Sequence, residues 1–150
     1  MPYDDDGLVR LNREECMDLL SSASFGRVGV SVRALPAILP VTIAVINELV
    51  VFRTIPGTKL AYAATGSILA VEADEYDPAT GEGWSVLVRG VATELADPTT
   101  VARARELLTE SWIGDESAEH YIGVGCDLVT GRRLHRAGER VGDTATPTAT

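Results

Sequence analysis

Turns too short to hold a helix join most of the strand-like runs of this 150-residue chain. Alternating apolar residues cover Phe25–Val32, and further apolar runs cover residues 36–46 and Leu49–Thr54. Parallel neighbours need a crossover of about a dozen residues or more, whereas antiparallel neighbours need only a hairpin. Asn47-Glu48 is a suitable two-residue hairpin connection. The chain is therefore predicted to form antiparallel strands rather than βαβ units.

The second half of the chain continues this pattern. Strand-like runs cover residues 67–74 and 84–95, and a loop at 77–83 that is rich in turn residues joins them. We expect Gly90 to interrupt the longer run, because a β-bulge at a glycine would let that strand bend. Residues 121–135 predict one bent strand or two short strands.

Pro40 lies inside the apolar run 36–46 and has no amide N–H to donate to a strand ladder. This run is therefore predicted to be an edge strand or a bulged strand. In total the pattern gives six or seven strands, mostly linked by hairpins. It predicts a mainly β (α+β) protein, an antiparallel barrel with short helices between its strands.

Helix-start signals precede each of the expected short helices. Asn12 can cap a helix that follows Leu11, with Glu15 three residues on as in a capping box. Asp97, followed by a proline, starts another helix by the same rules. Thr54 can cap a third helix over residues 55–64.

One domain accounts for the chain, because 150 residues are enough to bury a core without disulfides or metals. We expect a flexible N-terminus at residues 1–10 and the barrel domain at residues 11–136. Residues 137–150 are mostly glycine, threonine, alanine and proline, which predicts a disordered tail.

The composition excludes several classes of partner. A net charge of −9 argues against nucleic-acid binding, which needs a basic face to displace counterions from phosphates. No apolar run approaches the roughly 20 residues that span a bilayer, so no membrane association is expected. The acidic N-terminus is unlike a signal peptide, and we expect the protein to be cytoplasmic.

No metal site is expected. Cys16 and Cys126 form no Cys-x-x-Cys motif, which makes a structural zinc site improbable, and both thiols are expected to be reduced. An acidic stretch lacks the spacing of a calcium-binding loop and is interpreted as a solvated strand end: Glu72, Asp74, Glu75 and Asp77.

Lys59 is the only lysine in the chain, and it follows Gly57-Thr58 at the expected start of a helix. Arg53 lies six residues earlier, at the end of a predicted strand. Free amide groups and the dipole at a helix start attract anions, and an arginine can bind phosphate oxygens in a fork geometry. This stretch is predicted to bind a phosphate group, and the alternative is an ordinary strand-turn-helix with two exposed cations.

Other chemistries find little support. Gly57-Thr58-Lys59 is not a nucleotide-binding P-loop, because the Gly-Lys-[Ser/Thr] order is absent. Only His120 and His135 could serve a hydrolytic triad, and no Gly-x-Ser-x-Gly motif accompanies them. No catalytic residue is assigned.

Four motifs in the same order resemble the pyridoxamine 5′-phosphate oxidase-like, FMN-binding split-barrel proteins of actinobacteria. The resemblance covers roughly residues 10–135 and no single motif in it is as specific as a Walker loop. The motifs are Phe25-Gly26-Arg27-Val28-Gly29-Val30, the run 36–41, Val51-Phe52-Arg53-Thr54 with Gly57-Thr58-Lys59-Leu60, and Gly83-Trp84-Ser85-Val86-Leu87-Val88-Arg89-Gly90.

The resemblance implies a homodimer of six-stranded antiparallel split β-barrels with short flanking helices, with two FMN sites at the subunit interface. The residues that it assigns to the FMN phosphate are Arg53, Thr54, Thr58 and Lys59, and Gly57 is a further cofactor-binding residue. Those that it places along the flavin ring or at further cofactor contacts are Pro40, Val41, Thr42, Trp84 and Ser85. The residues alone favour a different interpretation of Trp84, as a half-buried strand aromatic that closes one end of the barrel.

Arg133-Leu134-His135 is similar to the Arg-x-His that grips the substrate in true pyridoxamine phosphate oxidases. The resemblance therefore implies Arg133 and His135 as substrate contacts, and the alternative for His135 is a surface position at a strand end. The tryptophan expected a few residues upstream is replaced around residues 127–129.

The predicted function is that of an FMN-dependent oxidoreductase in which the flavin carries hydride transfer on a small-molecule substrate. One alternative is a reductase that uses the deazaflavin F420 on a similar barrel. Another is a flavin-binding protein without turnover. The sequence does not identify the substrate or the electron donor.

Overall fold

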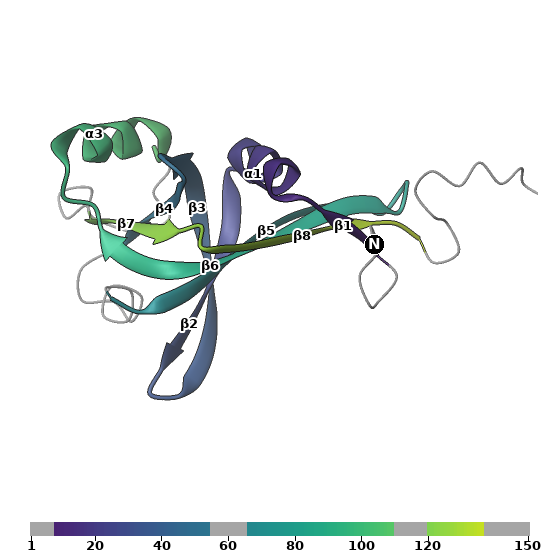
Figure 1. Cartoon of the computed structure of the whole chain (residues 1–150), viewed down its shortest axis with the longest axis horizontal. Helices are drawn as coiled ribbons and strands as arrows, with labels where there is room; N and C mark the ends of the chain where they lie inside the picture. Colours follow the sequence, from purple (N-terminus) through teal and green to yellow (C-terminus); the bar gives the residue numbers. More distant parts are fainter. Residues whose placement is uncertain (1–7, 55–65, 110–119, 137–150) are drawn as a thin grey trace, which may run out of the picture.

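The structure is a computed structural model that describes residues 8–54, 66–109 and 120–136 (Figure 1). Six strands close into an antiparallel barrel, as the sequence predicts. Their spatial order is β2-β3-β4-β7-β6-β5. Their bounds are β2 Phe25–Val32, β3 Leu35–Ile46, β4 Leu49–Thr54, β5 Ile68–Asp77, β6 Glu82–Glu94 and β7 His120–Gly125.

Two further strands extend the sheet on one side of the barrel. β8 (Leu128–Leu134) pairs with the first half of β6, and β1 (Val9–Leu11) pairs with the outer edge of β8. Residues 121–135 thus form two strands, which decides between the alternatives above. β1 includes Val9 and Arg10, which we expected to belong to a flexible N-terminus.

β6 changes partner along one of its edges. Its residues 83–89 pair with β8, and its residues 92–94 pair with β7. Along the other edge the register with β5 is continuous from Ile68↔Val91 to Asp77↔Glu82. The expected bulge at Gly90 is therefore wrong: Gly90 lies where β6 passes from one partner to the other, and a Cβ there would lie 1.8 Å from the Gly125 carbonyl oxygen.

β3 is likewise divided between two partners. Leu35 to Thr42 pairs with β2, and Ile43 to Ile46 pairs with β4. Pro40 lies in the half of β3 that, among the described strands, pairs with β2 alone. Of the two predicted forms, the edge strand is therefore the observed one. The β2–β3 hairpin projects from the body of the barrel (Figure 1).

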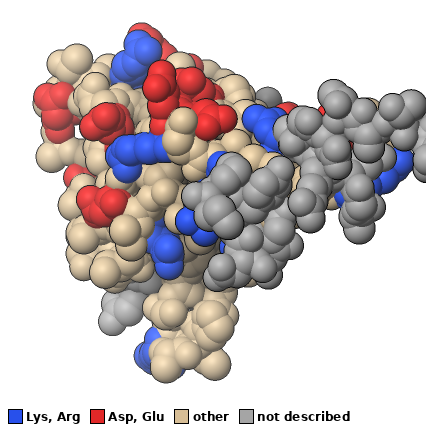
Figure 2. All heavy atoms as spheres, turned by 45° about the vertical axis from the view of Figure 1, so that its right-hand side comes forward, with Lys and Arg blue, Asp and Glu red and all other residues tan. Residues whose placement is uncertain are grey.

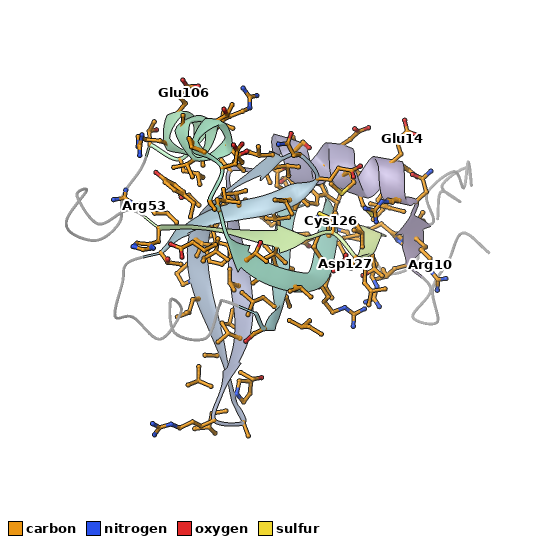
Figure 3. The ribbon with its side chains drawn as sticks, turned by 60° about the vertical axis from the view of Figure 1, so that its left-hand side comes forward. Arg10, Glu14, Arg53, Glu106, Cys126 and Asp127 are labelled. Carbon is orange, nitrogen blue, oxygen red and sulfur yellow. The ribbon has the colours of Figure 1, made fainter. Side chains whose placement is uncertain are left out.

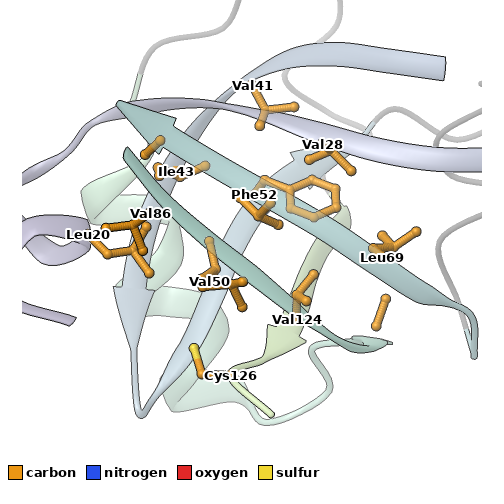
Figure 4. Packing of buried hydrophobic residues seen from close by; sticks show 14 of the residues in the cluster. Leu20, Val28, Val41, Ile43, Val50, Phe52, Leu69, Val86, Val124 and Cys126 are labelled. Atoms are coloured by element: carbon orange, nitrogen blue, oxygen red, sulfur yellow. The ribbon is translucent and has the colours of Figure 1, made fainter. Parts of the chain in front are cut away.

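Side chains that point into the barrel form the main core (Figure 4). They alternate along the strands because successive residues face opposite sides of a sheet. Valines dominate, and Phe52 is fully buried among them. Cys16 and Leu20 of α1 (Arg13–Ser22) complete this core from outside the strands.

The two described helices both begin as their caps predict. Asn12 and Glu15 form a capping box at the start of α1. The Asp97 side chain accepts a hydrogen bond from the Thr100 amide at the start of α3 (Pro98–Leu107). α3 covers a second, smaller core cluster on the outside of β3, β4 and β7 that includes Tyr121.

Several expectations lie outside the described residues. They are the helix at 55–64, the residues Gly57, Thr58 and Lys59, and the tail at 137–150. Among the described helices, neither has the length and apolar character needed to cross a membrane.

Candidate functional site

Arg53 and Thr54 end β4, where the sequence predicts a phosphate site. Thr54 is buried, and its hydroxyl donates a hydrogen bond to the carbonyl oxygen of His120 at 3.3 Å. The Arg53 guanidinium is partly buried, and one of its terminal nitrogens is shielded from solvent. The end of β4 thus holds a partly buried positive charge, while the Thr54 hydroxyl on the other face of the strand is bonded to β7.

Pro40, Val41 and Thr42 lie next to this strand end. The pairing of β3 with β4 stops at Ile43↔Phe52, so Thr42 and Arg53 are the next residues beyond the last pair. The two strands separate at this point because β3 continues along β2. The structure therefore brings together two groups of predicted cofactor residues, from β3 and from β4.

His120 and Glu94 contact each other near the same strand end. Thr54 pairs with His120 in register, and the His120 Nδ1 contacts a carboxylate oxygen of Glu94. From the sequence, His120 was a candidate only for a hydrolytic triad, and Glu94 was not a candidate. Their pairing depends on the register between β4, β6 and β7, which the chain order alone does not give.

Trp84 lies in the main core with only 7% of its surface exposed. Its indole Nε1 donates a hydrogen bond to Glu75 Oε2 at 3.2 Å. A buried indole N–H normally has such a partner. In the structure Trp84 is thus a buried strand aromatic of the main core cluster.

Ser85 faces the opposite side of the sheet, away from the core. Its hydroxyl lies 3.5 Å from Glu72 Oε2, while Glu72 Oε1 and Asp74 Oδ2 each lie 3.1 Å from the same Arg27 nitrogen, Nη1. Burial, and after it the neighbouring Asp74, raise the pKa of the Glu72 carboxyl to about 7, although Arg27 acts in the opposite direction. One guanidinium thus serves two carboxyl groups, one of which titrates near neutrality.

Arg133 and His135 lie at the end of β8. Arg133 pairs in register with Trp84 on one side and with Val9 on the other. His135 follows the strand, and its Nδ1 contacts the carbonyl oxygen of Arg136 at 3.0 Å. The two predicted substrate residues therefore lie beside Trp84 and Ser85, not beside Arg53.

The predicted site residues form two groups, one at the end of β4 and one where β6 pairs with β8. Arg53 is labelled at one end in Figure 3, and Arg10, which pairs with Arg132 next to Ser85, is labelled at the other. Figure 1 shows the same separation between β4 and β1 along the long axis.

The part of the chain that the structure describes contains no group of three or more His, Cys, Asp or Glu side chains that could hold a metal ion. This observation concerns only those residues. Burial raises the pKa of both the Cys16 and the Cys126 thiols, so neither is activated as a nucleophile by its surroundings.

A model of the pyridoxamine 5′-phosphate oxidase family matches residues 12–133 of this chain, which is most of its length. The chain belongs to this family. An uncharacterised protein of Mycobacterium tuberculosis is 39% identical over 145 residues, which cover 93% of this chain and 90% of that protein. The family resemblance seen in the four sequence motifs is thereby confirmed.

Solved structures show the same fold. The FAD binding protein from Mycobacterium smegmatis is 36% identical, with a TM-score of 0.70 that covers 85% of this chain and 98% of that one. An FAD-binding protein from Mesorhizobium loti has a TM-score of 0.75 over 86% of this chain and 98% of that one. At 21% identity, the second protein is evidence for the fold alone.

Proposed function

We propose that this member of the pyridoxamine 5′-phosphate oxidase family binds a flavin nucleotide and acts as a flavin-dependent oxidoreductase. One observation carries the proposal: Arg53 and Thr54 end a strand next to the point where Pro40 to Thr42 leave it. This places the positive charge of Arg53 beside a stretch of backbone that β4 no longer pairs with. Such a donor set fits a phosphate with a flat ring next to it.

The chain's own residues would bind and orient the cofactor. Arg53 would hold the phosphate together with Lys59, which lies outside the described residues. The backbone of Pro40 to Thr42 would run along the ring, where amide and carbonyl groups can meet its polar edge. The bound flavin would supply hydride transfer, and the protein would supply position and access.

The form of the flavin is part of the proposal. FMN is the form that the sequence motifs imply, whereas the Mycobacterium smegmatis relative is named for FAD binding. Both carry the phosphate that Arg53 would hold, so both fit the end of β4. The deazaflavin F420 also carries phosphate and is the alternative that a direct ligand analysis must exclude.

We further propose a homodimer with the cofactor at the subunit interface. Arg53 ends β4, whereas Ser85 lies on β6 where that strand pairs with β8, and a second subunit would let residues from these two places meet across an interface. The projecting β2–β3 hairpin supports this proposal, because Leu35 and Ile38 on it are 72% and 73% exposed. Exposed apolar surface of this kind is typical of an interaction site.

The identity of a co-purifying ligand, by absorbance and mass, is the test of the cofactor. A flavin that NAD(P)H bleaches and an acceptor restores would support the oxidoreductase. A flavin that binds tightly but is never reduced would support the alternative of a binding protein without turnover. A protein that ignores FMN and FAD but binds F420 would contradict the proposal.

Arg53→Ala and Lys59→Ala test the phosphate assignment. Each should weaken FMN binding by about 1.5–3 kcal/mol, the scale of a charge-assisted hydrogen bond, and leave riboflavin binding unchanged because riboflavin has no phosphate. Titration by flavin fluorescence measures both ligands. Arg103→Ala, an exposed arginine on α3, is the matched control. Wild-type FMN affinity in both variants would show that the phosphate lies elsewhere.

A further inference from the structure

The projecting β2–β3 hairpin carries almost no charge. It is the lower projection in Figures 1 and 2, and its surface in Figure 2 is uncharged except near the tip. Between Val32 and Val41 the only charged residue is Arg33, in the turn. Exposed apolar segments that form strands readily pair with strands of other molecules.

One edge of this hairpin is free. Residues 35–41 of β3 pair with β2, and no other described strand pairs with them. Two other free edges are protected in common ways: β1 has only three residues, and the part of β5 beyond its pairing with β2 carries Asp74, Glu75 and Asp77. Short edge strands and charged side chains both discourage pairing with another chain. The edge of β3 has neither protection.

The backbone hydrogen bonds show which residues of β3 face this edge. The Ile43 amide donates a hydrogen bond to the Ser24 carbonyl oxygen at 3.1 Å, so its N–H points toward the β2 side. In an antiparallel ladder, the direction of these groups alternates from one residue to the next. The odd-numbered positions of β3 in the hairpin therefore direct their N–H groups toward β2. Positions 36, 38 and 40 face the free edge.

The turn of the hairpin gives the same assignment. Arg33 and Ala34 both have a positive φ, of 52° and 65°, as a two-residue type I′ turn requires. In a β-turn the amide of the fourth residue points back toward the carbonyl group of the first. The fourth residue here is Leu35 and the first is Val32, so Leu35 again directs its N–H toward β2.

Prolines occupy two of these three outward positions. They are Pro36 and Pro40, and Ile38 lies between them. A proline has no N–H to donate, which is why it is tolerated only where the ladder does not need one. The free edge between the turn and Val41 therefore offers a single amide donor, that of Ile38. A strand that paired here would bury carbonyl groups without donors, which is costly.

We propose that Pro36 and Pro40 prevent a strand of another molecule from extending the sheet at the free edge of β3. The excluded partner is any extended segment, including the same edge of a second copy of this chain. A second subunit of the kind proposed above would then contact the hairpin through side chains such as Leu35 and Ile38, which are exposed. The inference does not depend on the flavin site, because it rests only on the directions of backbone groups.

Amide hydrogen exchange in the wild-type protein, followed by NMR, tests these directions. The Ala37 and Leu39 amides should exchange slowly because they lie in the ladder with β2, whereas the Ile38 amide should exchange about tenfold faster or more. An Ile38 amide that is protected as strongly as its two neighbours would overturn the proposal, because the edge would already have a partner.

The double variant Pro36→Ala/Pro40→Ala restores both missing donors. Its average mass in sedimentation equilibrium should rise about twofold or more above that of the wild type as the concentration increases. Circular dichroism shows whether the variant is folded. Pro98→Ala, at the exposed start of α3, is the matched control and should keep the wild-type mass. A folded double variant with the wild-type mass at every concentration would overturn the proposal.

Adding Ile38→Pro to the double variant distinguishes strand pairing from apolar association. The new proline again interrupts the outward donors, so the mass of this triple variant should not exceed that of the wild type. A triple variant that associates as strongly as the double variant would show that the edge is not involved. All masses are measured without flavin, since Pro40 belongs to the proposed flavin site. A protein that binds no flavin would contradict the proposed function and leave these expectations unchanged.

Discussion

Gly90 is the residue at which β6 leaves β8 and meets β7. A Cβ at this position would lie 1.8 Å from the carbonyl oxygen of Gly125, whereas a Cβ at Gly29 would lie 3.5 Å from its nearest neighbour, the Cβ of Ala70. The first distance is far below van der Waals contact and involves backbone that cannot rotate away. The second is an ordinary contact. A glycine is therefore required at position 90 but not at position 29, although both positions lie within strands.

Gly90→Ala should destabilise the protein by about 2–3 kcal/mol or more, because β6 and β7 must separate to admit the methyl group. Urea unfolding followed by circular dichroism measures this change. Gly29→Ala is the matched control and should shift the free energy of unfolding by less than about 1 kcal/mol. Equal effects in both variants would show that the crossing of the strands tolerates a side chain.

Glu72 should make stability depend on pH. Its pKa is raised from 4.5 to about 7 in the folded state, so the folded protein holds this proton more tightly than the unfolded chain. The resulting stabilisation is fully present below about pH 4.5 and is lost as pH rises through about 7.

Glu72→Gln removes this titration. Relative to the wild type, the variant should gain up to about 1 kcal/mol between pH 5 and pH 8, since solvent screening reduces the effect at a partly exposed carboxyl. Unfolding free energies of both proteins across this range give the difference directly. A constant difference at every pH would show that Glu72 has an ordinary pKa.

α1 is the element whose start is most clearly determined by local sequence. The Asn12 side chain accepts a hydrogen bond from the Glu15 amide at 2.9 Å, and the Glu15 carboxylate accepts one from the Asn12 amide at 3.2 Å. This arrangement fixes the start of the helix, so that Cys16 and Leu20 point into the barrel core.

Asn12→Ala should cost about 1 kcal/mol of stability, the usual value of an N-cap side chain. Ser22→Ala at the other end of α1 is a suitable control, because the exposed Ser22 hydroxyl bonds only to the Leu19 carbonyl oxygen within its own helix. Thermal unfolding of the two variants should differ by several degrees. No difference would mean that tertiary packing alone fixes the start of α1.

The elements that local signals specify were predicted, and those that depend on long-range pairing were not. The Asn47-Glu48 hairpin, the two helix caps and the six barrel strands follow from turns and periodicity read along the chain. β1 has only three residues, too few for a recognisable alternation, and it becomes a strand only because β8 is beside it. The division of β6 between two partners is invisible in its own sequence.

The same distinction applies to the candidate site. Arg53 was predicted as a binding residue because a strand end and a turn mark it in the sequence. The cluster of Arg27, Glu72 and Asp74 was not, because it depends on the register of β2 against β5. The separation of the Arg53 and Ser85 groups also required the three-dimensional structure.

At the scale of the whole molecule, the β2–β3 hairpin is the feature that most favours a dimer. If it packs against a second subunit, Ile38→Asp should shift the particle from twice the chain mass of 16.0 kDa to a monomer, because a buried unpaired carboxylate is costly. Sedimentation equilibrium measures the mass. Leu107→Asp on α3, where the leucine is also exposed, is the control and should leave the mass unchanged. A wild-type monomer at micromolar concentration would contradict the proposed dimer.

The pairing of β1 with β8 also constrains how the chain folds during its synthesis. Val9 lies opposite Arg133, so the sheet gains its last strand only when residues more than 120 positions apart in the sequence are both available. A ribosome releases the N-terminal segment first, and such distant pairings form slowly because a long loop must close. β1 must therefore wait, without its partner, until almost all of the described chain has left the exit tunnel.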